Sequence, residues 1–392
     1  MDFTECGFQV IRLTPEYLSN CGWQTMCVVL RDNSRHGSYY FQSPIDPKGS
    51  YVLRKEMRKW KWGENANGEL LVTIYNKLRN YISIYDLVRM GRKLLWKYDI
   101  DIIYACGPTA VLASHFLKLY RKGIKIVARF YGTFSLTKKI LGNKVRLMLS
   151  IDEVIALALR SDRIIITNDG SQGLRALRFC NKENLKVAHF LVNGVEKIHR
   201  SNIEQTYNGA ATICRLVRSK HIERGIECAD LLVNKYGLKN FVYTIVGDGP
   251  MHSSLYALVL KKRLEKNVVF TGAMNHSDAM DIMLKNMFYI STYDISNVGN
   301  PLLEAIRAHR IIVTINNGDT GKWIKHWRNG LIYDYSNDLS SQMARDMAEI
   351  IINPEKGEPL LAGIARTDKE KLRTWDERLQ EEEAILSSLL KA

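Results

Sequence analysis

The stretch 293–312 holds the residue types best suited to chemistry in this sequence. An apolar run precedes it, residues 296–300 are small and amide side chains typical of a turn, and Pro301 suits the first position of a helix. Free backbone N–H groups and the positive end of the helix would meet there, which predicts an anion-binding site. Glu304, in the first helical turn, either interacts with the helix dipole or binds a sugar diol beside a bound phosphate.

The length and the charge of the chain indicate how many domains it has and what kind of partner it binds. A chain of 392 residues predicts two domains of about 200 residues each. Residues 1–195 contain 30 Lys and Arg against 16 Asp and Glu, a net charge of +14, whereas the remainder has 26 against 25. The excess charge indicates an anionic partner for the first half, which could be nucleic acid, a phospholipid surface or a molecule that carries a pyrophosphate.

The composition also argues against several protein classes. No apolar run approaches the roughly 20 residues of a membrane helix, and the first residues are acidic, unlike a signal peptide. We therefore expect a cytoplasmic protein, either free or peripheral on the inner face of the plasma membrane. The seven cysteines form no CxxC pair, so we expect buried apolar thiols rather than disulfides or a zinc site.

The first hundred residues give mixed structural signals. Residues 8–13 are typical of a buried strand, and 23–30 suit either a helix or a strand. Basic and aromatic residues are interleaved over 51–62, which predicts a helix that is either solvated or lies in a membrane interface. Residues 75–98 repeat apolar side chains at helical spacing.

Strand and helix signals then alternate along the rest of the chain. This alternation predicts parallel sheets covered by helices on both faces. We expect a basic helix over 138–149 and a terminal amphipathic helix over 369–390. The predicted strands are 101–106, 125–130, 163–167 and 186–193 in the first half, and 211–215, 241–246, 267–271, 287–291, 311–315 and 331–333 in the second.

Four motifs in the second half resemble those of family 4 glycosyltransferases, which are retaining enzymes with the GT-B fold. The motifs are Asn193-Gly194-Val195, Arg215-Leu216 with Lys220, Val246-Gly247-Asp248-Gly249-Pro250, and Glu304-Ala305 at the start of a helix. Each motif alone is weak, but their order and spacing together are specific over residues 190–355.

The resemblance implies a fold and a division of the chain. The fold would be α/β, with two Rossmann-like parallel-sheet domains facing a central cleft and a C-terminal helix returning to the first domain. The first domain would span 1–195 and bind the acceptor, the second would span 196–365 and bind the nucleotide sugar, and the helix would span 366–392.

The resemblance also implies roles for individual residues. Arg215 and Lys220 would bind the donor diphosphate and stabilise the charge of the leaving group, and Glu304 would bind the ribose hydroxyls. No metal would be required. The other residues expected at the donor are Gly22, Tyr131, Gly247, Gly249, Asp294, Ser296, Asn297, Val298, Gly299, Asn300 and Leu302.

Several positions depart from the family pattern. The family has a second Glu eight residues before the one matching Glu304, where this sequence has Ser296. Asp294, Asn297 or Asn300 could replace that carboxylate. Tyr131 stands in place of a His, Gly22 is what remains of a Gly-Gly loop, and His221 replaces a Gly after the Lys. His115, His189, His252 and His309 have no metal-ligand spacing and read as structural or surface residues.

These features lead us to expect a retaining glycosyltransferase. It would move a sugar from a nucleotide diphosphate donor to a membrane-associated glycan or lipid-linked acceptor, as in the synthesis of cell-surface polysaccharide or glycolipid. The alternatives are a GT-B epimerase, a non-catalytic subunit of a glycosylation complex, or a nucleic-acid-binding protein that uses the basic half. Nucleic acid is the less expected partner because no standard recognition motif is present.

Overall fold

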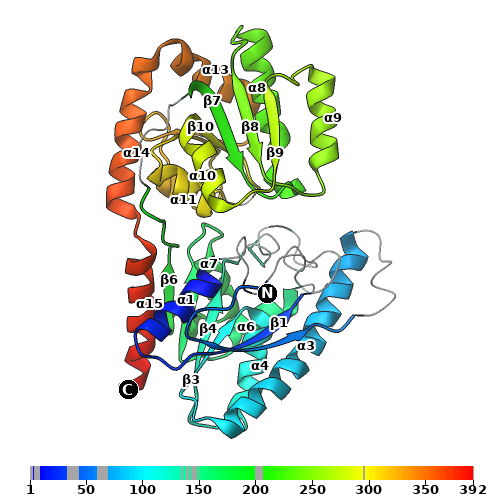
Figure 1. The fold of residues 1–392 in the computed structure, drawn as a ribbon, viewed down its shortest axis with the longest axis vertical. Helices are drawn as coiled ribbons and strands as arrows, with labels where there is room; N and C mark the ends of the chain where they lie inside the picture. Colours follow the sequence, from blue (N-terminus) through cyan, green and yellow to red (C-terminus); the bar gives the residue numbers. More distant parts are fainter. Residues whose placement is uncertain are drawn as a thin grey trace. The chain divides into compact units, whose positions relative to one another are not determined.

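The computed structural model describes residues 3, 9–32, 44–59, 69–133, 136–137, 140, 142, 147, 150–198, 206–294 and 296–391. The chain divides into two compact units, each a parallel sheet with helices packed on it (Figure 1). The first unit comprises Met1–Asn168, Gly173–Val192 and Asp376–Ala392, and the second comprises Asp169–Gln172 and Asn193–Trp375.

A four-stranded parallel sheet forms the centre of the first unit. Its strands follow the order β3 (Ile102–Cys106), β4 (Lys125–Phe130), β5 (Arg163–Thr167) and β6 (Ala188–Leu191). These strands match the four predicted ones, although the last is shorter because a 3-10 helix occupies Lys182–Val187. A separate parallel pair consists of β1 (Met26–Arg31) and β2 (Tyr51–Glu56).

Helices cover both faces of the four-stranded sheet. Alternate strand residues point to opposite sides, so each face has its own layer of apolar side chains for helices to cover. On one face Ala128 and Ile164 pack with Val111, Leu157 and Leu177. These residues come from α4 (Pro108–Lys118), α6 (Ile151–Ala158) and α7 (Gly173–Cys180). On the other face Val127 and Ile165 pack with residues of α1 (Gln9–Asn20) and α15 (Trp375–Leu390), namely Leu18, Ile385, Leu386 and Leu389.

The last helix belongs to the first unit, as predicted. Thr14 of α1 donates a hydrogen bond to Glu382 of α15, and the Trp23 indole donates to Glu383 at 3.2 Å. The terminal helical region is divided into α14 (Glu358–Lys371) and α15, where we expected one helix over 369–390. The break falls at Leu372, where the backbone becomes extended.

Two predictions for the N-terminal region were wrong. Residues 9–20 form α1 rather than a strand over 8–13, because Thr14 and Leu18, four residues apart, bury one helical face against α15 and the sheet. Residues 51–56 form β2 rather than a helix, and 23–30 resolves as a strand, β1, paired in register with β2. Residues 60–62 and most of the predicted helix 138–149 lie outside the described residues. The predicted helix over 75–98 is confirmed as α3 (Glu69–Lys97).

The second unit contains one six-stranded parallel sheet. The order is β12 (Leu331–Tyr333), β11 (Ile311–Ile315), β10 (Asn286–Ser291), β7 (Thr206–Ile213), β8 (Val242–Val246) and β9 (Val268–Gly272). All six agree with predicted strands. The core of this unit combines buried strand residues with α8 (Ile222–Asp230), α9 (His252–Lys262) and α13 (Leu339–Ile352). The predicted class, two Rossmann-like parallel-sheet domains, is therefore confirmed for each unit.

Candidate functional site

The strand order of the second unit identifies where a ligand would bind. From β7 the chain builds β8 and β9 on one side of the sheet, and then crosses to build β10, β11 and β12 on the other. In open parallel sheets, ligands bind beyond the carboxyl ends of the strands at such a switch point. The loops that follow β7 and β10 contain 214–221 and 292–299, so they carry most of the predicted donor residues to one edge.

Direct contacts hold these two loops together. The Asp294 amide donates to the Ser219 carbonyl at 3.1 Å, and the Thr292 hydroxyl donates to the His221 carbonyl at 3.0 Å. Lys220 lies over the ring of Tyr293, with its ammonium 3.6 Å from the ring centroid. The segment 214–221 and the loop 292–299, called the central loop below, therefore form one continuous surface.

Lys220 and Arg215 provide the positive charge of this surface. Lys220 is partly buried, and no carboxylate pairs with its ammonium among the residues the structure describes. Burial lowers the pKa of Lys220. Arg215 is exposed, and its guanidinium forms no ion pair within the same described part of the chain. Two cations without protein counter-ions, one partly desolvated, are suited to bind a phosphate group.

The turn after β8 fixes the backbone that carries Arg215. The Leu216 amide donates to the Asp248 carbonyl at 2.9 Å. A Cβ on Gly247 would lie 2.0 Å from the Cys214 carbonyl oxygen, and one on Gly249 would lie 2.4 Å from the Leu216 carbonyl oxygen. Both glycines thus allow the turn to pack against the segment 214–216. The space beside these two predicted donor residues is therefore filled by backbone of the same unit.

His221 is a site residue whose contacts the sequence did not reveal. It has φ 48° and ψ 47°, a left-handed conformation in which the family's Gly would be relaxed. Its ring nitrogens contact Glu223 Oε1 at 2.7 Å and the Asp294 carboxylate. Asp294, a candidate substitute for the missing carboxylate, is therefore already held by a histidine. The only sequence signal was the replacement of the expected Gly.

Internal hydrogen bonds fix the shape of the central loop. Asn297 is fully buried, accepts a hydrogen bond from the Tyr293 amide at 2.8 Å and donates to Asn317 Oδ1 at 3.0 Å. Ser296 Oγ accepts from the Val298 amide at 3.1 Å and donates to the Asp169 carbonyl at 2.9 Å. The side chains of Ser296 and Asn297 thus shape the loop.

The N-terminus of α11 (Asn300–Arg307) offers a single open N–H group near this loop. Of the predicted donor residues Val298, Gly299 and Asn300, the first two have amides that are already bonded: Val298 donates to Ser296 Oγ and Gly299 donates to the Asn297 carbonyl. The Asn300 amide has no acceptor among the described residues. The Asn300 side chain accepts a hydrogen bond from Asn193 Nδ2 at 2.7 Å, and Leu302 is buried in the core.

Glu304 is held by a histidine that the sequence analysis did not select. The carboxylate is largely buried, and its Oε1 lies 2.9 Å from Nε2 of His276, the first residue of α10 (His276–Lys285). This hydrogen bond raises the pKa of His276. The pair leaves Glu304 Oε2 without a hydrogen bond among the described residues, and a carboxylate oxygen in that state can accept from a hydroxyl group.

Two predicted donor residues belong to the first unit. Gly22 lies in the exposed turn after α1, with φ 89°. Tyr131 follows β4, donates to Cys106 Sγ at 3.2 Å and lies under the Arg129 guanidinium, 4.5 Å from the ring centroid. Burial raises the pKa of Tyr131. Both residues therefore belong to the first unit, whereas the residues around Lys220 belong to the second.

The described residues form neither a metal-binding cluster nor a membrane-spanning helix. None of their His, Cys, Asp and Glu side chains gather in threes with the geometry to hold a metal ion. Within the same residues, every helix is too short or too polar to cross a lipid bilayer.

Comparisons with known proteins show which families and folds this chain resembles. Residues 195–360 match the sequence profile of the family described as glycosyl transferases group 1. A comparison with curated protein sequences gave no match. Sucrose-phosphate synthase from Thermosynechococcus elongatus has a similar structure, with a TM-score of 0.74 at 13% identity over 100% of this chain and 96% of that one.

Two further solved structures extend the comparison. HepE from Anabaena, solved with UDP and glucose, gives a TM-score of 0.68 at 13% identity over 99% of this chain and 98% of its own. TarM from S. aureus, solved with UDP, gives 0.60 at 18% identity over 80% of this chain, which spans only 59% of TarM. These similarities establish the GT-B fold that the sequence predicted. Together with the profile match they support a place in the GT-B superfamily.

Proposed function

We propose that this protein is a retaining glycosyltransferase that uses a nucleotide diphosphate sugar as donor. The observation that carries the proposal is the surface around Lys220, at the switch point between β7 and β10. There a partly buried ammonium has no carboxylate partner in the described part of the chain. The profile match over 195–360 covers this surface, and HepE, whose fold is similar, was solved with UDP-glucose.

The donor diphosphate would be bound by Arg215, Lys220 and the Asn300 amide. As the bond between the sugar and the phosphate breaks, negative charge accumulates on the leaving nucleoside diphosphate. A guanidinium and an ammonium already in place stabilise that charge without reorganising solvent. Because these groups balance the charge, we expect full turnover after treatment with a metal chelator.

Glu304 would bind the ribose of the donor. Its Oε1 is held by His276, so Oε2 would accept hydrogen bonds from the two ribose hydroxyls. In this scheme Glu304 positions the nucleotide and does not act as a nucleophile. We therefore favour a front-face substitution, in which the departing phosphate oxygen takes the proton of the acceptor hydroxyl and the new glycosidic bond keeps the anomeric configuration.

The transferred sugar would be recognised differently here because of Ser296. Where the related family has a carboxylate, this protein has a hydroxyl bonded to the Asp169 carbonyl and the Val298 amide. The sugar would have to be recognised by neighbours such as Asp294, which His221 holds at the edge of the same loop. We therefore expect a preference among nucleotide sugars that differs from enzymes with both carboxylates.

The acceptor is proposed to be a glycan or lipid-linked molecule at the cytoplasmic face of a membrane. The support is the charge of the first half of the chain, +14 over residues 1–195, which favours an anionic partner. Synthesis of cell-surface polysaccharide or glycolipid would require such an acceptor.

Replacement of the two cations tests the donor site. Arg215→Ala and Lys220→Ala should each lower kcat/KM by roughly a hundredfold, the effect of losing about 3 kcal/mol of charge-assisted contact in the transition state. The donor would first be chosen from a panel of nucleotide sugars by thermal shift, because a ligand bound by the folded state raises Tm. Transfer would then be followed with the labelled donor and membrane extract.

Lys261→Ala is the matched control, because it removes one exposed Lys from α9 in the same unit. Its activity should equal that of the unchanged protein. Normal turnover in both site variants would refute the proposal. Turnover of the donor's sugar without any acceptor would indicate an epimerase instead.

A further inference from the structure

The long helix α3 has an exposed stripe of apolar and aromatic side chains. A helix packed on a globular core normally directs polar residues to solvent. Trp96 is 95% exposed and Tyr85 is 60% exposed, and both belong to a series spaced by three or four residues, which places the series on one side of the helix. All members of this stripe are exposed: Leu71, Ile74, Leu78, Tyr81, Tyr85, Arg89, Arg92 and Trp96.

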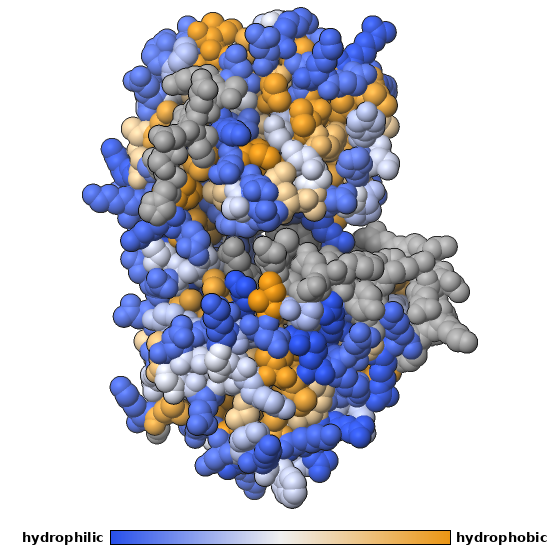
Figure 2. Space-filling view, viewed as in Figure 1, coloured by the Kyte–Doolittle hydropathy of each residue, from blue (hydrophilic) through white to orange (hydrophobic). Residues whose placement is uncertain are grey.

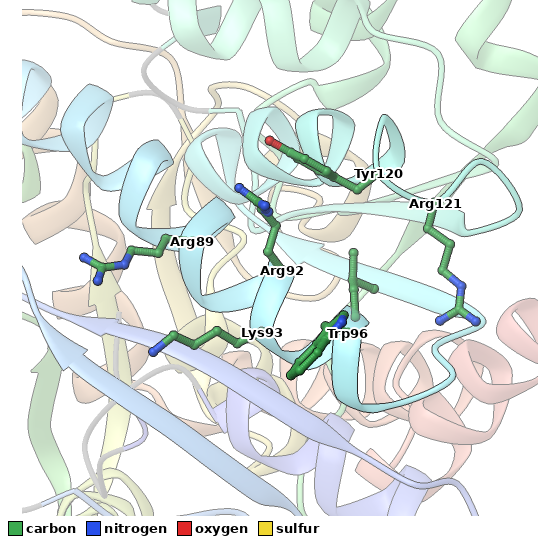
Figure 3. A pocket seen from close by; sticks show the side chains of 7 residues that line it. Arg89, Arg92, Lys93, Trp96, Tyr120 and Arg121 are labelled. Carbon is green, nitrogen blue, oxygen red and sulfur yellow. The ribbon is translucent and has the colours of Figure 1, made fainter.

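A shallow basic hollow adjoins the C-terminal end of this stripe, where α3 meets the end of α4 (Figure 3). Its volume is about 600 Å³. The Arg92 guanidinium extends toward Tyr120 and lies 4.4 Å from the ring centroid, so the two side chains form one wall. The lining residues are Arg89, Arg92, Lys93, Leu95, Trp96, Tyr120 and Arg121.

Two cations of the hollow, Arg89 and Lys93, differ from the basic residues of β2 and its flank in having no carboxylate partner among the described residues. Lys55 and Arg58, in the segment predicted to form either a solvated or an interfacial helix, both bind the buried carboxylate of Asp86. Arg89 and Lys93 are exposed and form no ion pair among the described residues. Arg121, which also lines the hollow, pairs with Asp99, so among the described residues the charge without a carboxylate partner is that of Arg89, Arg92 and Lys93.

We propose that the stripe on α3 and the adjoining hollow form a membrane-docking surface for an anionic bilayer. The proposal rests on the proposed function, because it names the surface that would bring the enzyme to a membrane-associated acceptor. Trp96 and the tyrosines would lie at the level of the lipid headgroups, and Leu71, Ile74 and Leu78 would enter the acyl boundary. Arg89, Arg92 and Lys93 would contact lipid phosphates.

The composition of the surface favours a bilayer over two other partners. Nucleic acid would use the cations and the aromatic rings, but the exposed aliphatic residues at the N-terminal half of α3 have no role in base stacking. A second copy of this chain, related by a two-fold axis at this surface, would bring Arg89 and Lys93 close to their own equivalents, and like charges oppose association. Figure 2 shows hydrophobic residues at the surface beside hydrophilic ones on the face of this unit that it presents.

Sedimentation with lipid vesicles tests the surface. The full-length protein should bind vesicles of phosphatidylcholine with 30 mol% phosphatidylglycerol and should not bind phosphatidylcholine alone. Each cation near an anionic surface strengthens partitioning about fivefold, so the double variant Arg89→Ala/Lys93→Ala should bind about 30-fold more weakly. Trp96→Ala should lower partitioning roughly tenfold at every salt concentration, because its contribution is mainly apolar.

Matched controls lie on the second unit. Lys261→Ala/Lys266→Ala removes the same charge from exposed positions, and Tyr335→Ala removes an aromatic ring that is 68% exposed. Both controls should partition like the unchanged protein. If they weaken vesicle binding as much as the α3 variants do, binding follows net charge and the proposal fails.

A second readout separates this proposal from the glycosyltransferase proposal. The α3 variants should keep the thermal shift that a nucleoside diphosphate produces, which also confirms that they fold. If vesicle binding requires α3 but the protein binds no nucleotide sugar, the glycosyltransferase proposal is refuted and the membrane-docking proposal still holds. Three results would overturn the surface itself: vesicle binding unchanged in the variants, binding to DNA or RNA but not to vesicles, and dimers that the α3 substitutions dissociate.

Discussion

The two units use positive charge in different ways. The first half of the chain has a net charge of +14, yet several of its cations pair with carboxylates, as Lys55 does with Asp86 and Lys77 with Asp152. The second half has a net charge of +1, yet its Lys220 is partly buried at a switch point and has no carboxylate partner among the residues that the structure describes. Burial and position in the fold, rather than the number of charges, therefore make Lys220 the stronger candidate for binding an anion.

Among the variants that test how the two units use charge, we expect the largest effect, a loss of stability of the first unit, from a substitution at Glu382. Its carboxylate is 1% exposed, pairs with the buried Arg378, and accepts hydrogen bonds from Tyr104 and Thr14. Glu382→Ala would leave Arg378 buried without a counter-ion, which typically costs about 3–5 kcal/mol. Denaturant unfolding followed by circular dichroism should show this loss in the free energy of unfolding of the first unit.

The control for Glu382 is Asp376→Ala, at an exposed position in the first turn of the same helix. It should cost about 1 kcal/mol or less, the usual effect of a carboxylate near a helix N-terminus. Equal losses in the two variants would mean that α15 is stabilised by its contacts in general and that the buried pair is unimportant.

A smaller effect is expected from Gly247 in the second unit. Gly247→Ala would place a methyl group 2.0 Å from the Cys214 carbonyl oxygen at a residue with φ 127°. We expect a loss of about 3 kcal/mol and weaker binding of nucleoside diphosphate, since the segment with Arg215 must shift. Gly237→Ala, at φ 72°, has the smaller backbone penalty of the left-handed helical region and meets no atom within 4 Å, so it should cost about 1–2 kcal/mol. Equal losses would contradict the packing argument.

The His276–Glu304 pair predicts a dependence on pH in the second unit. Because the bond to Glu304 raises the pKa of His276, its stabilisation is complete below the ordinary value of 6.5 and declines as the pH rises through the raised value. The His276 side chain is 44% exposed, so screening limits the effect to about 0.5–1 kcal/mol. The difference in unfolding free energy between the unchanged protein and His276→Ala should narrow from pH 6 to pH 9. A constant difference would show that protonation of His276 is irrelevant.

The smallest expected effect is proton uptake at Lys220. Burial lowers the pKa of this ammonium, and a bound diphosphate would favour its charged form. Calorimetric titration with nucleoside diphosphate at alkaline pH, in buffers of different ionisation enthalpy, should therefore show uptake of a fraction of one proton. Lys220→Met should abolish that uptake. Uptake that persists in the variant would assign the proton to another group.

The sequence predicted the second unit more accurately than the first. In the second unit the strands are continuous apolar runs and the turns between them carry Gly, so periodicity and turn chemistry agree. Near the N-terminus these signals conflict. Residues 9–20 form a helix because Thr14 and Leu18 pack against distant α15, a tertiary contact that outweighs local propensity.

Site prediction had a similar limit. The motif residues Arg215, Lys220, Gly247 and Glu304 could be chosen because spacing along the chain marks them. His276 could not, because its contact with Glu304 joins residues 28 positions apart on two helices. The internal role of Asn297 was equally invisible, since it depends on Asn317 and on the Tyr293 amide. Motifs therefore select the candidate residues, whereas the residues that hold them in position can be found only from the fold.

Hydrogen exchange measured by mass spectrometry, with and without nucleoside diphosphate, tests the central claim most directly. A panel of UDP, GDP and ADP covers the unknown base. For at least one of them, we predict slower exchange in the segments 214–221 and 293–300, and loss of that protection in Lys220→Ala. The account would be contradicted if no nucleoside diphosphate protects these segments, or if the protection they show is the same in Lys220→Ala.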